Sequence, residues 1–234
     1  MTTTHTADTI EVDLGGHTVT VPEGGLFERY RMQPDLDAIA QDPQVPGVDF
    51  FRAQPKIHVD SRVGPTWSPN FYYAISTARL TMLAPTSAIR RRLPDALSPV
   101  EVLPGLGLVS AMFFRYDVCD IDFYTEAAVG IAVQPGRHGG ASFLDLVTGL
   151  KNDHLHSYVL SLPVSTDIAA VRGRDGYGFP KWVTGLDVDI DEVRTTARVA
   201  NDAGGTDLAL ATPTPTQRRH TSGAHVGSLT SYTT

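Results

Sequence analysis

Cysteine is nearly missing from the 234-residue sequence, which contains only Cys119. One cysteine cannot form an internal disulfide, and we therefore interpret the protein as cytoplasmic. No apolar run approaches the roughly 20 residues of a membrane-spanning helix, and the first residues lack the basic-then-apolar order of a signal peptide. An excess of cationic residues is missing too, since the net charge is −7, which opposes binding to a phosphate backbone. The sequence therefore predicts no membrane segment and no nucleic-acid partner.

Long helical patterns are also absent, and the alternation of apolar and polar residues dominates. Residues 10–21 alternate around a Gly-Gly pair, which predicts a short β-hairpin. Alternation or β-forming residues predict further strands over 71–83, 106–118, 121–133, 155–162, 182–190, 192–200 and 206–212.

Two short helices are predicted between these strands. The first covers residues 86–94, with Thr86 or Ser87 as its N-cap, and the second covers 165–172 and ends at Gly173. Few short helices among many strands favour a β-dominated α+β fold built on an antiparallel sheet or barrel.

The stretch from about residue 22 to 69 is broken by prolines and glycines, with one short helix around 35–40. We expect it to be an irregular arm that wraps around the strands. Because a single β-rich domain can reach this length, we expect residues 1–234 to form one domain.

Lysine is scarce as well: of 19 basic residues only Lys56, Lys151 and Lys181 are lysines. Arginine stays protonated in proteins, whereas a desolvated lysine can lose its charge and attack a carbonyl carbon. Lys56 and Lys151 lie in polar, loop-like sequence, so neither has a strong claim to such a role.

Lys181 ends the segment Gly-Arg-Asp-Gly-Tyr-Gly-Phe-Pro-Lys at residues 173–181 and precedes Trp182. Its neighbours are apolar or aromatic, and burial among them penalises an ammonium group. A neutral amine prepared in this way can form a Schiff base with a ketone. The alternative is a surface lysine whose alkyl stem lies over an apolar rim.

A second candidate group lies in residues 123–133, where period two separates two unequal faces. Phe123 and every second residue to Val133 form an apolar packing face. The other face presents Tyr124 and Glu126 beside three very small residues. If this face points inward, Glu126 is a candidate general acid/base and Tyr124 a hydrogen-bond donor. If it points outward, it is an ordinary polar surface.

These two segments resemble a known family. The 173–181 segment resembles the lysine motif of the acetoacetate decarboxylase superfamily, and Tyr-Thr-Glu at 124–126 is similar to its acidic motif, in the same order. The resemblance extends over about residues 70–215. It implies a cone-like antiparallel β-barrel that encloses a Schiff-base lysine, in a homo-oligomeric enzyme.

The sequence also departs from that family. Trp182 stands where the family has a second lysine that helps to activate the first, and residues 109–112 contain no acid where the family has a second glutamate. The family's substrate-binding arginine aligns near Ile75, and Arg79 is four residues away. These departures favour aldol, dehydration or cyclisation chemistry over simple decarboxylation. Because relatives continue beyond the strand-like end of this chain, we expect a shortened or unusual C-terminus.

We therefore predict a cofactor-independent lyase that acts on a small oxo acid. Lys181 condenses with the substrate carbonyl, and Glu126 transfers protons. The residues expected to bind the substrate are Tyr124, Arg174, Phe179, Trp182 and Arg79. One alternative is a barrel that binds or cyclises an apolar metabolite without forming an imine. Another is a structural interaction protein that uses its N-terminal arm.

Two further side-chain types are set aside. His154 and His156 share one face of a predicted strand, but a third ligand at recognisable spacing is missing, so no metal site is predicted. Cys119 lies on a probable strand and is interpreted as a packing residue rather than a nucleophile.

Overall fold

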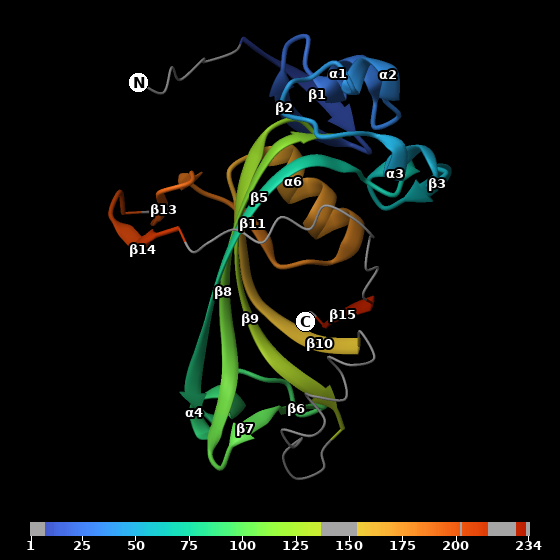
Figure 1. The fold of residues 1–234 in the computed structure, drawn as a ribbon. Helices are drawn as coiled ribbons and strands as arrows, with labels where there is room; N and C mark the ends of the chain where they lie inside the picture. The colour runs from blue at the N-terminus through green and yellow to red at the C-terminus, as the bar shows by residue number, and fades with distance from the viewer. Residues whose placement is uncertain (1–7, 137–153, 202, 215–227, 233–234) are drawn as a thin grey trace.

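The computed structural model describes residues 8–136, 154–201, 203–214 and 228–232 (Figure 1). Its main sheet has the strand order β11-β10-β9-β8-β5. These strands are β5 (Tyr72–Pro85), β8 (Leu106–Cys119), β9 (Tyr124–Pro135), β10 (His154–Val164) and β11 (Lys181–Val183). The short strands β6 (Leu97–Pro99), β7 (Glu101–Leu103) and β15 (Ser228–Tyr232) pair with β9, β8 and β10, respectively. The predicted strand-dominated fold is confirmed.

The pairing inside this sheet is mixed. Strands β5, β8, β9 and β10 pair in antiparallel fashion, as predicted. In contrast, β11 runs parallel to β10, because a helical crossover rather than a tight turn joins them. Within the described ranges no sheet closes on itself. The expected barrel is therefore not seen there, and β5 and β11 lie at opposite ends of the strand order.

The predicted N-terminal hairpin is confirmed as β1 (Thr9–Leu14) and β2 (His17–Pro22). Its turn needs both glycines, because Gly15 and Gly16 have φ values of +60° and +86°, which L-residues with side chains rarely adopt. Gly15 also packs against backbone: a Cβ there would lie 2.1 Å from the carbonyl carbon of Val63.

The stretch 22–69 is more regular than expected. It contains α1 (Leu26–Tyr30), α2 (Leu36–Ile39), α3 (Asp49–Arg52) and a hairpin of β3 (Ile57–Ser61) and β4 (Gly64–Ser68). Only α2 was predicted, and its N-cap Asp35 accepts a hydrogen bond from the Asp37 amide at 2.9 Å. Figure 1 shows these elements gathered with β1 and β2 at one end of the long strands.

Two helices differ in detail from the prediction. The first, α4, covers only Thr86–Arg90, and no side chain caps it; its tail tightens because the amides of Arg92 and Leu93 bond three residues back. The second, α6, covers Asp167–Val171. The chain does not leave the helix at Gly173, because a π-helical turn, η1 (Arg172–Gly176), continues it.

A separate antiparallel sheet contains β12 (Leu186–Ile190), β13 (Arg194–Ala200) and β14 (Thr206–Pro213). The strand predicted over 182–190 is thus split between β11 and β12. Apolar side chains from β12 and β13, such as Val188 and Val199, form one buried cluster with Phe113 of β8 and Ala127 of β9. In the part of the chain that the structure describes, no helix is long and apolar enough to cross a membrane.

Candidate active site

Lys181 and Glu126 meet in the interior. The Lys181 Nζ lies 2.6 Å from the Glu126 Oε2, and the two side chains are only 10% and 9% exposed. The sheet brings them together because Leu162 of β10 pairs with Lys181 on one side, while Val164 pairs with Glu126 on the other. The face of β9 that carries Glu126 therefore points inward.

Gly173 leaves the space that the Lys181 side chain occupies. A Cβ on Gly173 would lie 2.2 Å from the lysine Cδ and 2.6 Å from its Cε, far inside van der Waals contact. The π-helical turn thus lies directly against the lysine stem. A glycine is needed at residue 173 because the Lys181 side chain packs against it, whereas the sequence predicted that Gly173 ends the helix.

Three tyrosines form an aromatic wall beside the amine. The Lys181 Nζ lies 5.5 Å from the centroid of the Tyr124 ring. The Tyr124 ring stacks on Tyr116, and Tyr116 packs against Tyr72, at centroid distances of 4.4 and 4.7 Å. The Tyr116 hydroxyl also reaches the Glu126 Oε1 at 3.5 Å. Tyr124 was predicted here, but Tyr72 and Tyr116 were missed.

Burial makes these phenols harder to ionise. Desolvation raises the pKa of Tyr72 to about 12, and it raises the pKa of Tyr116 and of Tyr124 well above the ordinary value. A neutral phenol can donate a hydrogen bond to a developing oxyanion. At neutral pH the wall therefore offers donors without adding negative charge.

A cavity of about 340 Å³ opens beside the amine. Its lining includes three of the predicted site residues: Lys181, Tyr124 and Phe179. It also includes Asn70, Tyr72 and Arg172, which the sequence analysis did not single out. The cavity thus joins a buried lysine to aromatic and polar groups, as sites for small molecules do.

Three predicted substrate-binding residues do not line this cavity. The Arg174 side chain is 51% exposed and pairs with Asp175 at 2.7 Å. Trp182 lies on the opposite face of β11 from Lys181, because successive side chains of a strand point to opposite faces. There its Nε1 donates to the Ser161 Oγ at 3.3 Å. Arg79 is exposed on β5 and donates to the Ser110 Oγ at 3.0 Å. The structure brings none of these three to Lys181.

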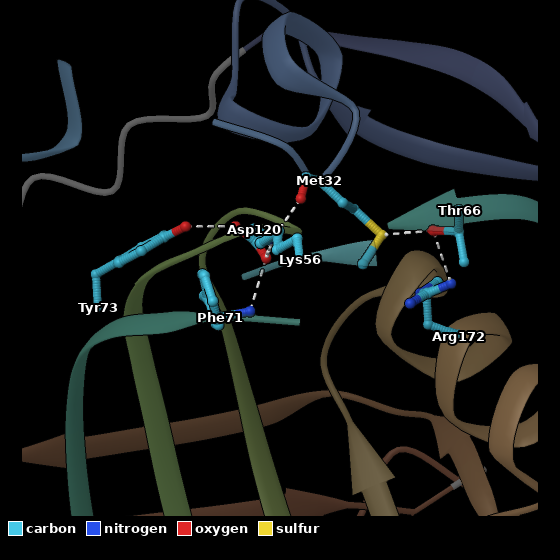
Figure 2. A network of polar contacts seen from close by, with 7 residues as sticks. All are labelled: Met32, Lys56, Thr66, Phe71, Tyr73, Asp120 and Arg172. Atoms are coloured by element: carbon cyan, nitrogen blue, oxygen red, sulfur yellow. Dashed lines mark hydrogen bonds and ion pairs between the residues drawn. The ribbon is translucent and has the colours of Figure 1, made fainter. Parts of the chain in front are cut away.

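Lys56 has a structural role that its polar sequence context concealed. Its buried Nζ pairs with Asp120 and donates to the Met32 carbonyl, as Figure 2 shows. Asp120 also accepts hydrogen bonds from the Phe71 amide at 2.6 Å and the Tyr73 hydroxyl at 2.7 Å. This network ties the N-terminal stretch to the start of β5, next to the cavity residues Asn70 and Tyr72.

The remaining candidate groups lie elsewhere. Cys119 is fully buried in the core, where its Sγ donates to the Asp122 carbonyl at 2.8 Å, and desolvation raises the pKa of the thiol. Among the described residues no three potential metal ligands cluster. Lys151 lies outside the described residues.

Comparison with known proteins gives one family. A family model described as acetoacetate decarboxylase (ADC) matches residues 62–231. No curated protein matches the sequence.

Solved structures that resemble the chain include an acetoacetate decarboxylase from Legionella pneumophila subsp. pneumophila str. Philadelphia 1, at 13% identity and a TM-score of 0.45, covering 70% of this chain and 53% of that one. They also include the enduracididine biosynthesis enzyme MppR complexed with pyruvate, at 13% identity and a TM-score of 0.42, covering 59% of this chain and 55% of that one. The match thus spans about half the length of each of these proteins.

Proposed function

We propose that this chain, which belongs to the acetoacetate decarboxylase family, is a lyase that binds a small oxo acid as an imine on Lys181. Membership of the family supports chemistry of the decarboxylase or aldolase-like type. The observation that carries the proposal is the contact of 2.6 Å between the buried Lys181 amine, which lines the cavity, and the buried Glu126 carboxylate, which contacts the amine without lining the cavity itself.

The two groups can begin the reaction by exchanging one proton. Glu126 accepts a proton from the Lys181 ammonium, and the neutral amine attacks the ketone carbon to give a carbinolamine. Glu126 then returns a proton to the carbinolamine oxygen, which leaves as water, and a protonated imine forms. This cation accepts the electron pair released when a C–C bond breaks or an α-proton leaves. Proton transfer by a positioned carboxyl group contributes about 10²–10⁴-fold to the rate.

The surrounding residues suit this sequence of steps. Tyr124, which donates to the Tyr72 hydroxyl at 3.3 Å, would turn this hydroxyl to the substrate oxygen, and Phe179 covers another part of the cavity. Trp182 adds no second cation beside Lys181, so the Glu126 carboxylate is the group that takes the lysine proton. Because the family's second acid is also missing, we favour aldol or dehydration chemistry over simple decarboxylation.

Borohydride trapping with pyruvate tests the proposal. The wild-type protein is expected to gain the mass of one reduced pyruvate adduct. Peptide mapping is expected to place it on Lys181, and Lys181→Ala is expected to abolish it. The isosteric change Glu126→Gln is expected to slow trapping by about 10²-fold or more. An adduct of unchanged yield in Lys181→Ala would remove the lysine from this role.

The same ion pair supports one competing function. An ammonium group held by a carboxylate is not a nucleophile, so Lys181 can instead be a hydrogen-bonding residue of a protein that binds or cyclises an apolar metabolite without an imine. In that case no oxo acid is trapped by the wild-type protein. Lys181→Met is then expected to retain the affinity for an apolar ligand. The lyase proposal instead requires that the wild-type protein forms an adduct with the oxo acid.

A further inference from the structure

Arg172 is a buried arginine that forms no ion pair with any carboxylate among the described residues. The residue is 4% exposed, lines the cavity and begins the π-helical turn η1. Its Nη1 donates to the Thr66 Oγ1 at 3.2 Å (Figure 2), and its guanidinium carbon lies 5.7 Å from the centroid of the Tyr177 ring. Its Nη2 is buried and has no hydrogen-bond partner, and no carboxylate pairs with the guanidinium in the described part of the chain.

A buried cation without a counter-charge is costly, because its lost hydration is not replaced. Desolvation accordingly lowers the pKa of Arg172, although an arginine keeps its charge at neutral pH. If Arg172 served only to hold the fold, an acid beside it would remove this cost. An arginine left unpaired in a cavity wall instead matches an anion that arrives from outside.

Asn70 adds a second set of unused polar atoms to the same cavity. Both its Nδ2 and its Oδ1 are buried and lack hydrogen-bond partners among the described residues. The amide provides two further N–H groups without adding charge. Buried polar groups in native proteins nearly always find partners, so the unpartnered Arg172 Nη2 and the unpartnered Asn70 amide, on two residues that line one cavity, match a polar ligand.

We propose that Arg172, assisted by Asn70, binds the carboxylate of the substrate. This assignment rests on the proposed function, since it places the acid group of the oxo acid in the same cavity as the amine that attacks its ketone. One guanidinium and one neutral amide match a planar monoanion. A phosphate carries more charge than these two groups compensate. Arg172 thereby replaces Arg174 and Arg79 as the arginine expected to recognise the substrate.

Oxamate allows a test that does not depend on imine formation, because it has the shape and charge of pyruvate but no ketone. Calorimetry is expected to show that the wild-type protein binds oxamate at least about 10-fold more tightly than its neutral methyl ester. Arg172→Gln is expected to weaken oxamate binding by about 10- to 100-fold and to leave the ester unchanged. Arg174→Gln and Arg194→Gln, which change arginines outside the cavity lining, are expected to bind both probes as the wild type does.

A second variant keeps the test valid if Arg172→Gln does not fold. Asn70→Asp preserves the side-chain volume and adds a negative charge to the wall, so it is expected to weaken oxamate binding and spare the ester. The proposal is overturned if the wild-type protein does not prefer oxamate, if folded Arg172→Gln binds it normally, or if Arg174→Gln is the variant that loses it.

The two proposals fail in different ways. If oxamate binding depends on Arg172 but pyruvate is never trapped on Lys181, the carboxylate site stands and the lyase mechanism falls. If pyruvate is trapped as efficiently by Arg172→Gln as by the wild type, the lyase mechanism stands and the carboxylate site falls.

Discussion

Gly173→Ala is the most direct test of how the lysine is positioned. The new methyl group would begin 2.2 Å from the Lys181 Cδ, whereas carbon atoms in contact lie about 3.5–4.0 Å apart. The lysine stem therefore has to move by at least about 1.3 Å. Such a shift breaks the 2.6 Å contact between the Lys181 Nζ and Glu126. Misplacement of a reacting group by about 1 Å can reduce a rate by 10²-fold.

The expected outcome has a kinetic part and a thermodynamic part. Borohydride trapping of pyruvate by Gly173→Ala is expected to slow by about 10²-fold. Unfolding in urea is expected to show a loss of about 1–3 kcal/mol, as for other overpacked sites.

Gly176→Ala provides the matched control in the same helical turn. A Cβ on Gly176 would meet only the Val63 Cγ2, at an ordinary distance of 3.6 Å. This variant is expected to trap pyruvate normally and to be as stable as the wild type or up to about 1 kcal/mol more stable. If Gly173→Ala traps pyruvate at the wild-type rate, the reasoning about the lysine position is wrong.

Three further predictions concern other parts of the molecule. Lys56→Met is expected to destabilise the protein by about 3–5 kcal/mol in urea, because Asp120 stays buried without its cation. Desolvation raises the folded-state pKa of Asp120, so its carboxyl group takes up a proton more readily in the folded protein. The destabilisation of Lys56→Met should therefore become smaller as the pH falls. A destabilisation that is independent of pH would contradict this. Cys119 is expected to react with a thiol reagent at pH 8 only after unfolding, because burial both covers it and raises its pKa; rapid labelling of the folded protein would refute its packing role. We expect a homo-oligomer in light scattering, and Leu80→Glu with Leu83→Glu, which alter exposed apolar side chains of the edge strand β5, should shift it towards monomer; an unchanged mass would place the interface elsewhere.

Local sequence singled out Lys181 and Glu126 but left their burial open, and the resemblance to the two family motifs placed them together, where the structure has them in contact. Lys181 stood out because lysine is rare and its neighbours are apolar, and period two placed Glu126 and Tyr124 on one face. The Gly15-Gly16 turn could also be predicted from the sequence, because the conformation of a tight turn depends on its own residues.

Features that depend on distant residues were not predictable. Lys56 finds its partner Asp120 64 positions away, and nothing near Lys56 in the sequence signals a buried pair. Arg172 and Arg174 look alike in sequence, and only the π-helical turn buries the first and exposes the second. The expectation that Trp182 binds the substrate had a different flaw. Neighbouring residues of a strand point to opposite faces, so Trp182 could not share a face with Lys181. The parallel pairing of β11 with β10 was not predicted, although the sequence indicated the helix over 165–172 that forms the crossover between them.

The turn from α6 through η1 to β11 gathers the cavity residues Arg172, Gly173, Phe179 and Lys181 into one short peptide, 172–181. If Arg172 binds the carboxylate and Lys181 the ketone, as proposed, this peptide rather than the whole sheet determines the distance between the two groups. Insertion or deletion of a residue between Arg172 and Lys181 would change the distance between these two side chains. It would select oxo acids with a longer or shorter chain between carboxylate and ketone, while Glu126 stayed fixed on β9.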